Sequence, residues 1–114
     1  MIELLLQAER LLVHGMLDQA ERLYRQAIET DPRNSIAMVG LARVALERGD
    51  DRGAYTLAVD ALAIDPDNAA AQRLATRMDE VLRTRGEAVP GDAGRSQEGA
   101  GQKRGFLSRL RGRR

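Results

Sequence analysis

Two short stretches decide the fold: TDPRNS at Thr30–Ser35 and IDPDNA at Ile64–Ala69, which lie 34 residues apart. Each contains an Asp-Pro step that cannot continue a helix, because proline lacks the backbone N–H and restricts the residue before it. Asn34 and Asn68 follow, and their short side chains can accept hydrogen bonds from the first N–H groups of a new helix. Each stretch therefore predicts the end of one helix and the start of the next.

Other residues recur at the same spacing. Gly15 is matched by Gly49, and both interrupt apolar runs where a turn between two helices is expected. Three alanine pairs have the same offset: Ala8 and Ala42, Ala20 and Ala54, and Ala27 and Ala61. Because small residues let facing helices approach closely, these alanines predict tightly nested hairpins. The repeat unit is thus a helix, a turn and a second helix.

Apolar residues recur at helical spacing in five segments. The segments are Leu4–Leu12, Leu17–Ile28, Ile36–Leu46, Tyr55–Ile64 and Leu74–Leu82. We expect an all-α fold in which residues 1–86 form one domain, with repeats at about 1–34 and 35–68 and a capping helix at 69–86. Two repeats and a cap are short for a solenoid, since about three units are usually needed for stability. Self-association or partner binding would complete such a body.

This pattern resembles the tetratricopeptide repeat, whose period, turn glycines, alanines and proline it shares. Tyr24 also stands where that family places an aromatic residue. The chain departs from the family at some positions: Leu4 and Met38 stand where the family has tryptophan, Leu11 and Ala45 where it has tyrosine, and Ala58 where the second repeat would have an aromatic residue. These departures loosen the packing but keep the pattern. The resemblance implies a short helical solenoid with a concave groove that receives a peptide or a helix of a partner protein. It implies a non-enzymatic adaptor or scaffold.

The composition gives no support for an enzyme. The chain has no cysteine and one histidine, His14, so the usual metal clusters and thiol chemistry are not expected. His14 precedes the turn glycine Gly15 and is expected at the surface. Glycines at Gly94–Gly105 lack the order of a phosphate-binding loop and follow no strand. We therefore expect no cofactor, no metal and no catalytic residue.

The resemblance also implies which side chains face the groove. The groove would be lined by the first helix of each repeat and by the capping helix. It would have an apolar side and a group of three arginines, Arg43, Arg73 and Arg77. The candidate partner-binding residues are Leu5, Glu9, Leu12, Val39, Arg43, Leu46, Arg73 and Arg77. An amphipathic segment with an acidic group would fit such a surface. The alternative is that the apolar residues are ordinary core and that the arginines are a solvated face.

Charge is distributed unevenly along the chain. Residues 1–86 carry 11 arginines and 14 acidic residues, a net charge of −3, whereas residues 87–114 carry seven basic and three acidic residues, a net charge of +4. Residues 87–102 are rich in glycine and poor in apolar groups, which predicts a flexible linker. Residues 103–114, KRGFLSRLRGRR, then form a basic amphipathic tail, because Phe106, Leu107 and Leu110 fall on one side of a helical wheel.

The tail has four competing interpretations. It resembles the C-terminal membrane-targeting helix of the Min-system ATPases, although Arg111 stands where that helix has a second aromatic residue. Its six cations would also suit nucleic-acid phosphates, an acidic protein surface or the chain's own body, or they would only keep the chain soluble. The candidate tail residues are Lys103, Arg104, Phe106, Leu107, Arg109, Leu110 and Arg111.

The N-terminal residues MIELLLQAER have no basic segment before the apolar run and are broken by Glu3, so they do not predict a secretory signal. We expect a cytoplasmic protein, peripheral at the inner membrane face if the tail binds lipid. The partner is expected to be a protein, an anionic membrane surface is a second candidate through the tail, and nucleic acid is the weaker alternative.

Liposome sedimentation tests the membrane interpretation. Anionic vesicles should pellet the full chain but not a variant that ends at residue 102, because each cation near an anionic surface contributes about 1 kcal/mol. Neutral vesicles should pellet neither. Equal behaviour of both chains with anionic vesicles would rule out the membrane interpretation, and a parallel gel-shift assay with DNA and RNA would test the nucleic-acid alternative.

Overall fold

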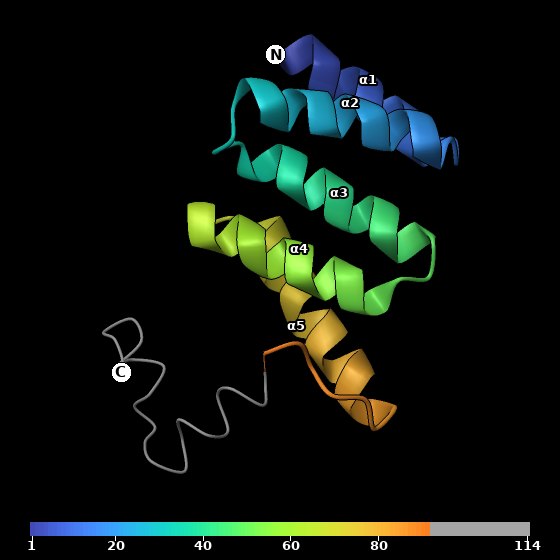
Figure 1. Cartoon of the computed structure of the whole chain (residues 1–114), viewed down its shortest axis with the longest axis vertical. Helices are drawn as coiled ribbons and strands as arrows, with labels where there is room; N and C mark the ends of the chain where they lie inside the picture. Colours follow the sequence, from blue (N-terminus) through green and yellow to red (C-terminus); the bar gives the residue numbers. More distant parts are fainter. Residues whose placement is uncertain (92–114) are drawn as a thin grey trace. The chain divides into compact units, whose positions relative to one another are not determined.

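Five helices are present in the computed structural model, which describes residues 1–91 (Figure 1). They are α1 (Ile2–Val13), α2 (Leu17–Thr30), α3 (Ser35–Glu47), α4 (Asp51–Ile64) and α5 (Ala69–Thr84). Residues 1–91 contain no strand, and the prediction of an all-α fold with five helices is confirmed. No helix in this part of the chain combines the length and the apolar character needed to cross a bilayer.

The contacts of the chain divide it within α5 into two compact units, Met1–Val81 and Leu82–Arg114, which are described separately. The predicted linker and tail lie outside the described residues, apart from Glu87–Gly91. The division at residues 86 and 102 stays a prediction.

Glycines end both first helices of the repeats. Gly15 and Gly49 have φ of 78° and 82°, in the left-handed region that residues with a Cβ rarely adopt. After α1, the Met16 N–H donates to the Leu11 carbonyl at 2.9 Å, and after α3 the Asp50 N–H donates to the Ala45 carbonyl at 2.8 Å. These bonds satisfy carbonyls that the helix end would otherwise leave without a partner.

The Asp-Pro turns have the predicted caps. The Ala37 N–H donates to Oδ1 of Asn34 at 2.9 Å, and the Ala71 N–H donates to Oδ1 of Asn68 at 3.0 Å. The Asn68 amide nitrogen also donates to the Ser35 hydroxyl at 3.1 Å. The same asparagine therefore starts α5 and ties this turn to the beginning of α3.

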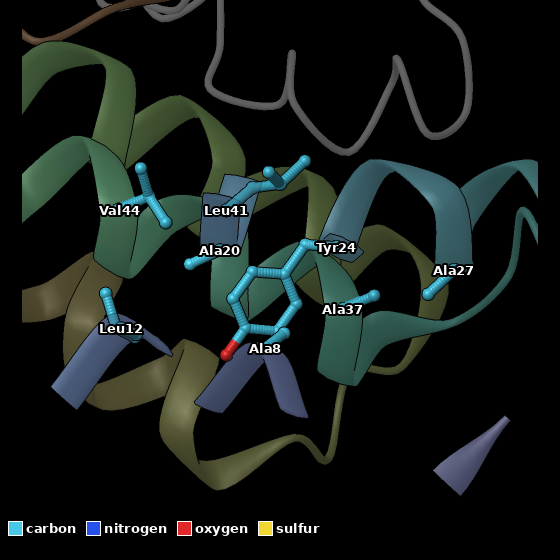
Figure 2. Packing of buried hydrophobic residues seen from close by; sticks show 8 residues of the cluster. All are labelled: Ala8, Leu12, Ala20, Tyr24, Ala27, Ala37, Leu41 and Val44. Carbon is cyan, nitrogen blue, oxygen red and sulfur yellow. The ribbon is translucent and has the colours of Figure 1, made fainter. Parts of the chain in front are cut away.

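Tyr24 joins the first hairpin to the second. Its ring is 3% exposed and lies in a buried cluster that α1, α2 and α3 build together (Figure 2). A Cβ added at Gly40 would overlap that ring, so glycine is what allows the ring to lie against α3. The other members of the cluster are Ala8, Leu12, Ala20, Ala27, Ala37, Leu41 and Val44. The repeated alanines are thus contact points between helices, as the sequence predicts.

Helix α3 packs against both α2 and α4 and is the most buried element of this unit. Its remaining inner side reaches α5 through a small cluster formed by Val39, Ala61 and Ala71. This arrangement leaves one stripe of α3 uncovered by α2 and α4, and that stripe forms the candidate site.

Ion pairs tie the end of α3 to α2. The Arg48 guanidinium bonds the Glu21 carboxylate at 2.6 Å and also bonds Asp18. Glu21 accepts a further bond from Arg25 at 2.9 Å. The Arg48 hydrogen bond and then the Arg25 hydrogen bond hold the pKa of Glu21 below its ordinary value of 4.5.

In the second unit, the described residues complete α5 and continue to Gly91, with Val89 buried. The Glu87 N–H donates to the Leu82 carbonyl at 2.8 Å, and Gly86 has φ of 76°. This repeats the glycine-terminated helix end of α1 and α3. Arg85 and Glu87 form an ion pair at 3.1 Å beyond it.

Replacing Gly40 by alanine should lower the free energy of unfolding by about 1–3 kcal/mol, because the methyl group overlaps the Tyr24 ring. The sign is opposite to helix propensity, which favours alanine over glycine by about 1 kcal/mol. Urea unfolding followed by circular dichroism measures the free energy of unfolding of the wild type, of each single variant and of the double variant with Tyr24→Val. In a Tyr24→Val background the same Gly40→Ala change should cost less or become favourable. An equal cost in both backgrounds would contradict the contact.

Acid should weaken the Arg48 cluster. Since the folded pKa of Glu21 is lowered, its contribution to stability is complete above 4.5 and is lost as the pH falls through the folded pKa. The loss of unfolding free energy between about pH 7 and about pH 3 should therefore be larger for the wild type than for Arg48→Gln. Arg22→Gln, on the same side of α2 but outside the cluster, is the control. A wild-type and an Arg48→Gln protein with the same pH dependence would refute the effect.

Candidate functional site

A hollow with a volume of about 520 Å³ lies between α3 and α5. Val39, Arg43 and Leu46 follow one another at helical spacing on the uncovered stripe of α3. On α5 the matching stripe consists of alanine, leucine and two arginines, so both helices present an apolar strip edged by cations. The lining residues are Val39, Arg43, Leu46, Ala70, Arg73, Leu74 and Arg77.

A second hollow, of about 200 Å³, continues the first toward α1. Leu5 and Glu9 line it from α1, while Ile36 and Gly40 line it from α3, with the Tyr24 ring below. Val39, Arg43 and Ala70 line both hollows, which are therefore continuous. We call the two hollows together the groove.

One ion pair crosses the groove. The Arg43 guanidinium donates to both carboxylate oxygens of Glu9, at 2.7 and 3.3 Å. Both side chains are a little under half exposed, so solvent weakens the attraction, and such pairs contribute about 0–1 kcal/mol. The pair nevertheless neutralises Arg43 and links α1 to α3. Beneath it, burial and then the charge of Glu9 raise the pKa of Tyr24, which keeps the phenol protonated.

Glu9, Arg43 and Arg77 lie 34 residues apart in turn, at equivalent points of α1, α3 and α5. Glu9 pairs with Arg43, and Arg77 has no such ion-pair partner among the described residues. Arg73 and Arg77 are exposed, and among residues 1–91 their side chains make no ion pair or hydrogen bond. Uncompensated positive charge therefore lies at the α5 side of the groove, beside the apolar strip.

Most of the residues predicted for partner binding line the groove. The structure brings together Leu5, Glu9, Val39, Arg43, Leu46, Arg73 and Arg77. Leu12 does not line it, because it is 5% exposed and belongs to the buried cluster around Tyr24. Whether the seven bind a partner stays a prediction.

Sequence reasoning missed Leu74, which is 9% exposed and forms part of the α5 wall. Leu74 belongs to the apolar pattern expected of a helix, but that pattern does not distinguish groove residues from core residues. Gly40 and Tyr24 were also missed as lining residues, because their place depends on how α2 meets α3.

Other expected features can be located as well. His14 is exposed at the C-terminal end of α1, as predicted. Within residues 1–91, no group of three or more histidine or acidic side chains lies close enough to hold a metal ion. The candidate tail residues, Lys103 to Arg111, lie outside the described residues.

Comparison with protein families decides the classification. The profile of the tetratricopeptide repeat matches residues 11–78, more than half of the chain. The chain belongs to the tetratricopeptide repeat family. The matched range runs from the end of α1 through α2, α3 and α4 into α5, so the resemblance seen in the sequence is confirmed. No curated protein and no solved structure was found to match the chain.

Tetratricopeptide repeats stack helical hairpins into a solenoid with an extended concave surface that binds other proteins. The chain is accordingly a protein–protein interaction module. The groove is formed by α1, α3 and α5, the first helix of each repeat and the cap.

Proposed function

We propose that the groove binds an amphipathic partner segment whose apolar side contacts the strip between α3 and α5 and whose acidic group pairs with Arg77 and Arg73. The chain then acts as a non-enzymatic adaptor that holds this segment. The observation that carries the proposal is the unequal pairing of the arginines: Arg43 bonds Glu9, whereas Arg73 and Arg77 of α5 form no ion pair among the described residues.

The apolar part of the site supports a helix or an extended peptide with spaced apolar residues. Val39 and Leu74 are nearly buried at the bottom, and Leu46 is partly exposed beside them. Ile36, 64% exposed, extends the apolar surface toward α1. Burying such side chains contributes about 25 cal/mol per Å² of apolar area, so the apolar strip supplies affinity.

The charges supply orientation more than affinity. A partner carboxylate next to Arg77 would pair with that arginine as Glu9 pairs with Arg43, whereas a carboxylate at the α1 end of the groove would be repelled by Glu9. The acidic end of the segment is therefore expected over α5. Chaperone-binding members of the family clamp a C-terminal carboxylate with lysine and asparagine at two positions of the repeat, where this chain has Leu5, Glu9, Val39 and Arg43 instead.

Binding of synthetic peptides tests this proposal. We expect an amphipathic peptide with leucines on one side and glutamates at one end to bind more tightly than the same peptide with glutamines. Arg77→Glu should weaken binding of the acidic peptide about tenfold at low salt, since the change removes an attraction and adds a repulsion. Binding of the glutamine peptide should be almost unchanged. Fluorescence anisotropy at low and high salt gives the dissociation constants.

Arg22→Glu is the matched control, because it makes the same charge change on α2, outside the groove. It should bind both peptides as the wild type does. Equal binding of the acidic peptide by the wild type and by Arg77→Glu would exclude the proposed site. Circular dichroism confirms that each variant is folded.

A further inference from the structure

Helix α1 has an apolar outer face. Ile2, Leu6 and Val13 are 68%, 54% and 67% exposed. At 100° per residue they fall within about 40° of one another around the helix, opposite the side that enters the core. The core side is made by Leu4, Leu5, Ala8, Leu11 and Leu12. The helix is thus apolar on two sides, and residues 1–91 cover only one of them.

The apolar outer face of α1 is not part of the groove, since Ile2, Leu6 and Val13 line neither hollow. An exposed cluster of large apolar side chains on one helix marks an interaction surface.

The charges beside this face are self-complementary. Glu3 and Arg10 flank Leu6, and together with Gln7 they line a shallow hollow of about 350 Å³. They lie seven residues apart, about two helical turns or 10 Å. Neither side chain has an ion pair or hydrogen bond among the described residues. One end of the face is therefore acidic, and the other end is basic.

We propose that this face binds a second copy of the chain, with the two α1 helices antiparallel. A twofold axis that crosses α1 near Gln7 brings Glu3 of one copy close to Arg10 of the other, and does so twice by symmetry. The same axis brings Ile2 close to Val13 of the second copy and Leu6 close to the axis. An antiparallel pair thus matches both the charged and the apolar residues of the face.

The size of the face sets the strength of the dimer. The surface area that one side of a 12-residue helix can bury is well below the roughly 800 Å² that each partner buries in a standard interface. The dimer is therefore weak and reversible, and it forms at high local concentration. Its apolar contacts are made by exposed side chains, so their replacement does not disturb the core of the monomer.

Sedimentation equilibrium of the full chain, from micromolar to millimolar concentration, measures the dimer. The wild type should show a monomer–dimer equilibrium, and Leu6→Lys should raise the dissociation constant at least about tenfold, because it places two cations at the axis. Val59→Lys is the matched control, since Val59 is an exposed apolar residue of α4, and it should dimerise as the wild type does. A wild type that is monomeric throughout, as when the face is meant for a different protein, overturns the proposal.

Charge exchange tests the antiparallel orientation. Glu3→Arg and Arg10→Glu should each weaken the dimer several-fold at low salt, because each change sets like charges opposite one another twice. The double variant, and an equimolar mixture of the two single variants, should restore it. Single variants that dimerise as the wild type does, or a double variant that stays as weak as the single ones, would overturn this arrangement. Circular dichroism verifies that all variants are equally helical.

Discussion

The contact on which the structure depends most is that between the Tyr24 ring and the backbone of Gly40. It joins the two hairpins, because Tyr24 belongs to the first repeat and Gly40 to the first helix of the second. The ring occupies the space that a side chain at Gly40 would fill, and the alanines around it allow the helices to approach closely. With this stacking, the uncovered stripe of α3 lies between α1 and α5, and the groove follows from it.

The sequence predicts the helices and their order well, for local reasons. The Asp-Pro steps, the asparagine caps and the turn glycines each act within a few residues, and each is found where predicted. The capping helix, expected at 69–86, begins at Ala69 as α5. Apolar spacing alone indicated only Tyr55–Ile64 and Leu74–Leu82, which are shorter than α4 and α5. The caps Asp50 and Asn68 set the starts of these two helices, and apolar spacing marks only turns that reach the core.

The candidate site was predictable in its membership but not in its charges. A helical stripe on each first helix follows from the 34-residue period, and seven predicted residues line the groove. The bond between Glu9 and Arg43 depends on how α1 stacks on α3, which no local pattern gives. The same stacking turns Leu12 into the core. A signal was nevertheless present, since Glu9, Arg43 and Arg77 share one repeat position and their charges do not cancel.

The proposed role of this tetratricopeptide repeat module is to receive an acidic amphipathic segment over α3 and α5. Nuclear magnetic resonance of the isotope-labelled chain, titrated with such a peptide, tests this binding site most directly. We expect amide and methyl shifts to concentrate along Val39–Leu46 and Ala70–Arg77, with the largest changes at the acidic end near Arg77. Shifts confined to the outward sides of α2 and α4 would contradict this binding site.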